Sequence, residues 1–317
     1  MQKVYNGEHI EGRIFTHELK IKTVQNQASA NFGKEFISGT LDVAVDEEGM
    51  NVIQTHFTYV APVTSTGKTN STFFALKKII DEGKGRTWVV NGKDAATKVK
   101  IDTALALNDF YTADDQLVSV MQNEGGFVTI INELCSEIER NTFKTDMVIT
   151  NVTRVEKDEE KNIDADYVVV KGVIFNFRNA IMPVEFRVEN VGGMKYFEDL
   201  EASNANPVFT QVWGRINSNT IKMVRTEESA FGENSVQTYE RKVKKWVITG
   251  TKKVPYDFGD EKVLTMEELQ KAAQDREVYL ADIKKRRDEY QASKTSSTPA
   301  VQTAAPSAPA NKGGFTF

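Results

Sequence analysis

The sequence predicts a mainly β protein with a few helices, built from two small β-barrels in tandem, a C-terminal helix and a disordered tail. Most runs alternate apolar and polar residues, which is the period of a strand. One helix-like run interrupts the strands at the same point of each half, and the chain loses its large apolar residues after position 293. The expected divisions are a first barrel (1–133), a second barrel (134–255), a helix (256–292) and a tail (293–317).

The first half opens with residues 10–24, which alternate between Phe15, Leu19 and Ile21 on one face and polar residues on the other. A turn at 46–49 predicts a hairpin. Residues 71–82 switch to helical spacing, with Ser71 as the expected N-cap. The remaining strands of this half are expected at 35–45, 50–60, 87–90, 99–107, 117–121 and 127–131.

The second half repeats this order. A helix-like segment at 194–202 separates the expected strands 145–155, 166–178 and 182–188 from 208–217, 220–226 and 235–249. A glycine interrupts the second strand of each half, Gly39 in one and Gly172 in the other. An interior glycine marks a bulge or bend, which a small closed barrel needs to turn its corner.

Three strands, a helix and two or more strands is the element order of the oligonucleotide/oligosaccharide-binding (OB) fold. Two such modules followed by a polar tail resemble single-stranded DNA-binding proteins, especially those encoded by phages of Gram-positive bacteria. The resemblance covers about residues 10–255, as a pattern of elements. It implies a protein that coats and protects single-stranded DNA during replication or recombination, without sequence specificity.

The richest candidate contact surface is Phe209–Gly250. Strand alternation places Trp213 and Arg215 outward, and it places Lys242, Lys244 and Trp246 outside while Val243 and Val247 face the core. Cations that follow phosphates and rings that stack on bases suit single-stranded DNA, whereas a solvated face is the alternative. Phe175 and Phe177 are interpreted as core filler. The further expected DNA contacts are Arg178, Arg187, Lys222, Arg225 and Arg241, with Lys20, Lys22, Lys98 and Lys100 on the first barrel.

The C-terminal segment begins with a capping box, Thr265 to Glu268, and its helix is expected to reach about Tyr290. The tail beyond it is rich in Ser, Thr, Pro and Ala and ends with Phe315 and Phe317. Tails of bacterial single-stranded DNA-binding proteins are similar and recruit replication proteins, although their tips are acidic. A tail that ends in an aromatic by chance is the alternative.

Composition excludes several classes of function. A net charge of −5 argues against a protein that coats duplex DNA, and the single Cys135 predicts no internal disulfide and no cysteine-based zinc site. His17 and His56 are expected in barrel walls, and acidic runs such as 46–48 are expected at solvated turns. No catalytic constellation, metal or cofactor is expected.

We therefore expect a cytoplasmic, non-enzymatic protein whose partner is single-stranded DNA, with no membrane association and no targeting segment. The N-terminus lacks the apolar core of a signal peptide. A homo-oligomer stays open as an alternative state. The alternative function is a structural or assembly protein, such as a virion component, whose β modules bind protein.

Overall fold

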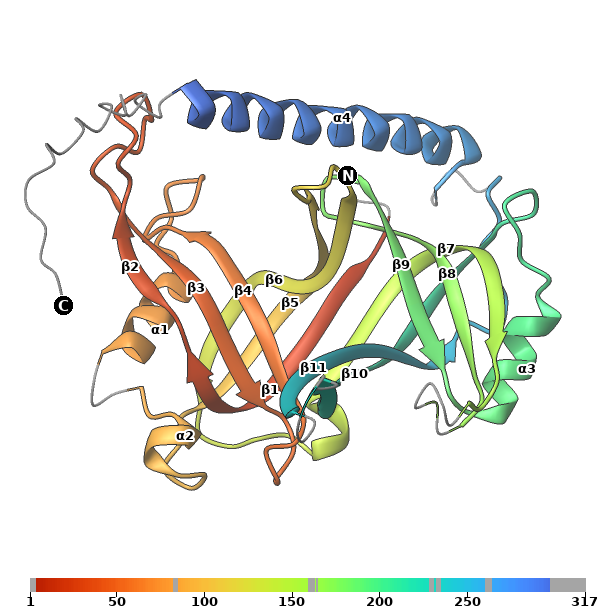
Figure 1. The fold of residues 1–317 in the computed structure, drawn as a ribbon, viewed down its shortest axis with the longest axis horizontal. Coiled ribbons are helices and arrows are strands. Elements are labelled where there is room, and N and C mark those ends of the chain that lie inside the picture. The colour runs from red at the N-terminus through yellow and green to blue at the C-terminus, as the bar shows by residue number, and fades with distance from the viewer. Residues whose placement is uncertain are drawn as a thin grey trace, which may run out of the picture.

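The fold is described by a computed structural model of the chain (Figure 1). It describes residues 4–81, 85–158, 163, 165–227, 231, 235–259 and 264–296. Within these ranges the side chains of 219–227, 235–242 and 293–296 are not described.

The first barrel is closed by the pairing order β1–β3–β4–β6–β5–β1. The β4–β6 pairing is parallel and the other four are antiparallel. This is the predicted OB-like order, with a helix between the third and fourth barrel strands. Its elements are β1 Asn6–His17, β2 Lys20–Thr23, β3 Glu35–Ala44, β4 Val52–Val60, α1 Ser71–Ile80, α2 Trp88–Asn91, β5 Lys98–Tyr111 and β6 Leu117–Ile131.

The second barrel repeats that closure as β7–β8–β9–β11–β10–β7, and again only the pairing of the third and fifth strands is parallel among the described residues. A short 3-10 turn, Glu137–Glu139, precedes it. The elements are β7 Asn141–Val155, β8 Tyr167–Phe175, β9 Ile181–Val188, α3 Val191–Asp199, β10 Val208–Glu227 and β11 Ser235–Thr251.

Each barrel is plugged by its helix in the same way. Asn70 caps α1 by accepting a hydrogen bond from the Thr72 amide, and Asn190 caps α3 by accepting one from the Gly193 amide. The buried faces of the two helices close the barrel interiors with Phe73, Leu76 and Ile79 in α1 and with Met194 and Phe197 in α3. The predicted N-cap at Ser71 was wrong by one residue.

The two predicted glycine bends are present. Gly39 has a φ of +133° and lies where the β3–β4 register shifts. Gly172 lies opposite a register shift in β7, and a Cβ there would lie 2.1 Å from the Val148 carbonyl oxygen. Both glycines therefore allow the second strand of a barrel to approach the first closely.

The barrels are joined by backbone pairing rather than by side chains alone. One edge of β1 pairs with β3 through residues 13–17 and with β7 through residues 6–10, opposite 141–145. The other edge pairs with β5. Strand β1 is thus a wall of the first barrel and also the strand on which the second barrel is hydrogen-bonded.

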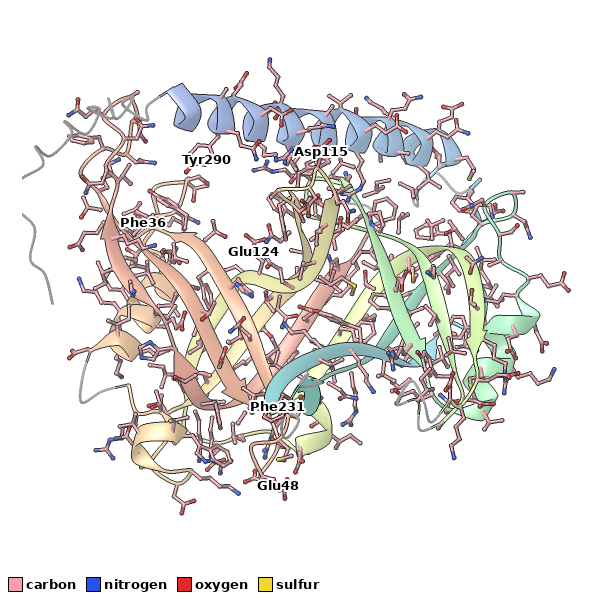
Figure 2. The ribbon with its side chains drawn as sticks, viewed as in Figure 1. Phe36, Glu48, Asp115, Glu124, Phe231 and Tyr290 are labelled. Atoms are coloured by element: carbon pink, nitrogen blue, oxygen red, sulfur yellow. The ribbon has the colours of Figure 1, made fainter. Side chains whose placement is uncertain are left out.

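Helix α4, Met266–Ser296, lies across one side of both barrels (Figure 1). Its predicted capping box is confirmed, because Thr265 and Glu268 exchange amide-to-side-chain hydrogen bonds. Its Arg276 pairs with the buried Asp109 of β5 at 2.9 Å. Asp115, at the tip of the β5–β6 hairpin, binds Lys284 and Arg287 (Figure 2). No helix in the described ranges has both the length and the apolar character needed to cross a membrane.

Several element predictions needed correction. The expected strand at 87–90 is the helical turn α2. The expected pairs of strands at 117–121 and 127–131, and at 208–217 and 220–226, are the single long strands β6 and β10. Long hairpins twist and bulge, so polar or glycine residues within them imitate turns. The division into independently folding domains stays a prediction.

The acidic turn 46–48 is more than a solvated tip. The Glu47 carboxylate forms ion pairs with Arg140 at 2.7 Å, Lys93 at 2.8 Å and Arg13 at 3.1 Å. Hydrogen bonds from Lys93 and then Arg140 lower the pKa of Glu47 to about 2. The carboxylate therefore ties the β3–β4 turn to β1, to the segment before β5 and to the connector between the barrels.

We expect Glu47→Gln to lower the free energy of unfolding at neutral pH. A carboxylate whose pKa is lower in the folded than in the unfolded state stabilises the fold above the unfolded pKa, and this stabilisation disappears as the pH falls towards the folded pKa. The difference between the wild type and the variant should therefore shrink between about pH 4.5 and pH 2. Urea unfolding across this range measures it, with Glu48→Gln as the matched control. An equal difference at pH 7 and pH 2.5 would contradict this role.

Candidate nucleic-acid interface

A groove of about 1000 Å³ lies on the outer face of β8 and β9. Strand β11 and the β5–β6 hairpin of the first barrel also line it. This is the face formed by the second and third strands of the barrel, which binds oligonucleotides in OB-folds. Because the hairpin comes from the other barrel, the groove exists only when both barrels are in place.

Basic side chains outnumber acidic ones in the groove. Lys171, Arg187, Lys244 and Lys245 line it, and Glu185 is the one carboxylate among its described lining residues. Glu185 pairs with Lys171 at 2.7 Å, and both side chains are about half exposed. The groove therefore carries a local positive charge although the chain as a whole is acidic.

A ring lies next to this charge. The Arg187 guanidinium stacks over the Tyr167 ring at 4.2 Å from its centroid. The two residues come from neighbouring strands, since Val169, two positions after Tyr167, pairs with Arg187. The buried Phe186 and Trp246 form part of the floor. A flat ring beside a cation can receive a base and its phosphate together.

The equivalent face of the first barrel has a different character. Its hollow, about 530 Å³, is lined by His56, Asp109 and Glu124 and by Tyr279 of α4. Glu124 lies on this face in Figure 2. No lysine or arginine is among the described residues that line this hollow, and α4 covers part of it. The described lining of the first face therefore lacks the basic side chains that line the second.

Trp246 corrects the predicted alternation of β11. The ring is buried, 4% exposed, and its Nε1 donates a hydrogen bond to Glu8 at 2.7 Å. The side chains of Trp246 and Ile248 face the core. Val247, between them, is the residue of β11 that pairs with Arg187 of β9 in the sheet. An indole buries more apolar area than a valine, and here its N–H finds a partner in the neighbouring barrel. Lys244 lies 5.6 Å from the centroid of this ring and donates to the Gln54 carbonyl.

The other two leading candidates lie away from the groove. Trp213 is 38% exposed as predicted, but it lines a separate hollow with Tyr5 and Phe127. Arg215 donates to the Ile138 carbonyl at 2.6 Å, so it holds the connector between the barrels. No described residue lines both hollows.

The turn after β8 corrects the interpretation of Phe177. Strand β8 ends at Phe175, which is buried, so the expected alternation stops there. Phe177 is 73% exposed, and the Arg178 guanidinium lies 5.1 Å from its ring. An exposed ring and cation at a barrel turn form a second potential contact for a nucleotide.

The predicted basic residues of the first barrel are dispersed. Lys20 and Lys22 are exposed on β2. Lys98 donates to the Asn132 carbonyl, and Lys100 pairs with Asp102 at 3.4 Å. None of these four lines the groove on the second barrel. The side chains of Lys222, Arg225, Arg241 and Lys242, and the tail residues Phe315 and Phe317, lie outside those that the structure describes.

The groove contains Tyr167, Lys171 and Lys245, which sequence reasoning did not select. A signal was present, because Tyr167 and Lys171 alternate with the buried Val168 and Val170 of β8. They become candidate contacts because Arg187 and the hairpin from the first barrel lie next to them. The sequence of one strand does not show which residues of other strands will be its neighbours.

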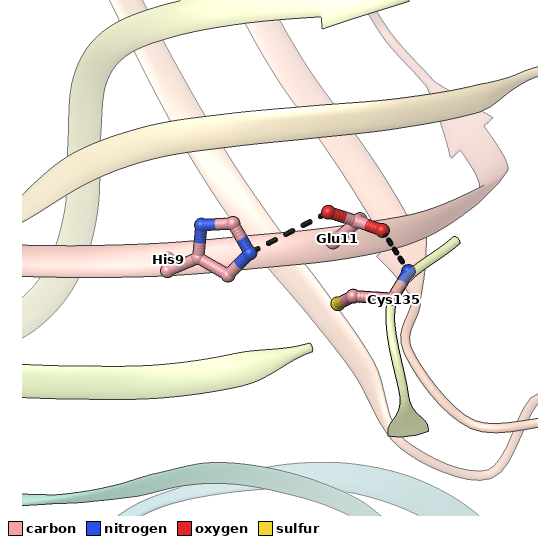
Figure 3. Close-up of side chains that lie close together, drawn as sticks. All are labelled: His9, Glu11 and Cys135. Atoms are coloured by element: carbon pink, nitrogen blue, oxygen red, sulfur yellow. Dashed lines mark hydrogen bonds and ion pairs between the residues drawn. The ribbon is translucent and has the colours of Figure 1, made fainter. Parts of the chain in front are cut away.

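A metal-ligand cluster lies outside the groove. His9, Glu11 and Cys135 each offer one atom of a kind that binds metals, and these three atoms lie within 4.8 Å of one another (Figure 3). The sequence predicted no cysteine-based zinc site, because Cys135 is the single cysteine of the chain. Burial and the nearby Glu11 raise the pKa of the Cys135 thiol to about 11.

The chain belongs to the YorF family, whose sequence model matches residues 10–286. No curated protein matches it. Among solved structures, it is similar to a deletion mutant of the single-stranded DNA-binding protein from Thermus aquaticus. That similarity has a TM-score of 0.46 and 10% sequence identity, and it covers 82% of this chain and 100% of the other.

Glu8 allows a test of the seam between the barrels, which is the junction where β1 of the first barrel pairs with β7 of the second. Burial raises its pKa from 4.5 to about 7, opposed by the Trp246 hydrogen bond and the charge of Lys244. A carboxyl with a raised folded pKa binds its proton more tightly in the folded state, so stability falls as the pH rises from about 4.5 to 7. The loss should reach roughly 3 kcal/mol.

We expect Glu8→Gln to remove this part of the pH dependence, so that the variant loses less stability than the wild type between pH 5 and pH 8. Urea unfolding monitored by tryptophan fluorescence measures both proteins. Glu18→Gln is the control and should keep the wild-type slope. Parallel stability curves for the wild type and Glu8→Gln would contradict the raised pKa.

Proposed function

We propose that this member of the YorF family is a non-enzymatic protein that binds single-stranded DNA without sequence specificity along the groove of the second barrel. The observation that carries the proposal is the juxtaposition of Lys171 and Arg187 with the ring of Tyr167 on the face where OB-folds bind oligonucleotides.

The mechanism follows from the two kinds of side chain. The cations neutralise phosphates and release counterions, so affinity falls with salt. Tyr167 offers its ring to a base, which contributes about 1–3 kcal/mol for any base. A single strand can present phosphates and unpaired bases at once, whereas a duplex keeps its bases stacked inside. The groove thus favours single strands.

In the cell, this protein would coat exposed strands during DNA replication or recombination. Its tail, with Phe315 and Phe317, would present an aromatic tip to replication proteins. The reacting groups of an enzyme are not required for either role. A homo-oligomer would extend the coated length along the strand.

A second candidate function, protein assembly, is favoured by the hollow around Trp213. Phe127 is 72% exposed and Tyr5 52% exposed in that hollow of about 580 Å³. Glu8 and Asp102 line it together with Lys144, so the exposed rings rather than a surplus of cations characterise this hollow, and such apolar surface suits a protein partner. The assembly function would use Trp213 in a protein contact, whereas DNA binding in the groove does not use it.

Fluorescence anisotropy with labelled oligo-dT tests the proposal. We expect Arg187→Ala and Lys171→Ala each to weaken binding several-fold at low salt and to lower the slope of log affinity against log salt by roughly 0.7 per phosphate contact. Tyr167→Ala should weaken binding while the slope stays unchanged, because it removes stacking only.

The matched control is Lys22→Ala, which removes an exposed cation from the first barrel and should leave affinity unchanged. Trp213→Ala should also bind as the wild type does. Loss of DNA binding in Trp213→Ala but not in Arg187→Ala would show that DNA binds at the hollow around Trp213 and not in the groove. Equal affinity for the duplex and the single strand would contradict the proposal.

A further inference from the structure

The cluster of His9, Glu11 and Cys135 connects two distant parts of the chain. His9 and Glu11 are two positions apart on β1, so their side chains share one face of the strand. Cys135 lies in the connector that leads from the first barrel to the second, and its amide donates to Glu11 Oε1. The connector is therefore already held with its thiol towards the histidine and the carboxylate.

The distances suit a small tetrahedral ion. His9 Nε2 lies 3.6 Å from Glu11 Oε2. Two ligand atoms bound to zinc at about 2.0–2.1 Å with tetrahedral angles stand roughly 3.3 Å apart, so the His9 and Glu11 atoms need only a small movement to bind one ion. The Glu11 side chain is 9% exposed and its Oε2 faces the histidine, which places a carboxylate charge at the point where a cation would lie.

His9 is also oriented by its other ring nitrogen. Nδ1 lies 2.9 Å from Asp102 Oδ1, and Lys100 pairs with the other carboxylate oxygen at 3.4 Å. A carboxylate on the far nitrogen of a ligating histidine fixes the tautomer that leaves Nε2 free to bind metal. Asp102 would thus act as a positioning residue.

We propose that His9 Nε2, Glu11 Oε2 and Cys135 Sγ form a binding site for a divalent transition metal, with zinc as the best match. A nitrogen, an oxygen and a sulfur ligand favour borderline-soft zinc over magnesium or calcium. Solvent completes the fourth position, and the Cys135 proton is released on binding. The site fastens the connector to β1 and does not depend on DNA binding.

The full-length reduced protein, freed of metal with a chelator, tests the site. We expect one equivalent of zinc per chain by titration calorimetry, a higher melting temperature with zinc, and slower alkylation of Cys135. Cobalt should give the thiolate-to-metal absorption that only sulfur ligation produces. His9→Gln and Cys135→Ser should each abolish the tight site, and Asp102→Asn should weaken it about 10–100-fold.

His56→Gln is the matched control, because it removes a histidine outside the cluster and should keep one equivalent of zinc. Circular dichroism of each variant without metal separates loss of the site from loss of the fold. Zinc bound as tightly by folded Cys135→Ser as by the wild type, or a cobalt complex without the sulfur band, would overturn the proposal.

Discussion

The antiparallel pairing between residues 6–10 of β1 and 141–145 of β7 is the constraint on which the rest of the structure depends. It fixes the second barrel against the first through backbone hydrogen bonds, which specify register as well as contact. Glu8, bonded to Trp246, and His9, in the ligand cluster, both lie in this short stretch. The groove also depends on it, since the β5–β6 hairpin of one barrel must stand over β8 and β9 of the other.

The two barrels share a topology but not a surface charge. The open face of the second barrel is basic, whereas that of the first carries Asp109 and Glu124 and lies partly under α4. Arg276 of α4 holds the helix over the first face, because it pairs with Asp109 there and also donates a hydrogen bond to the Ile181 carbonyl of β9. The two barrels therefore share a fold, but the basic groove of the second has no counterpart on the described equivalent face of the first. One face is lined by basic side chains, and the other lies partly under a helix of the same chain.

The order of strands and helices was predictable from sequence because it depends on the spacing of apolar residues within each short segment. Alternation located most strands, helical spacing located α1 and α3, and Gly39 and Gly172 identified the bends of the two barrels. Pairing between residues more than 100 positions apart has no local signature. For the same reason the predicted face of β11 was wrong at Trp246, whose partner Glu8 is 238 positions away. Arg187 was selected correctly as an outward cation, but its neighbours Tyr167 and Lys171 acquire meaning only in the folded groove.

The shared edge of β1 has a consequence for the order in which the chain is made. All strands of the first barrel precede residue 132, so they are synthesised before any strand of the second barrel. Until β7 emerges, residues 6–10 present an unpaired strand edge, which is a template for any complementary strand. The strand with the correct register is the β7 of the same chain or of another copy. Exchange of second barrels between two chains would therefore keep the same pairing of β1 with β7.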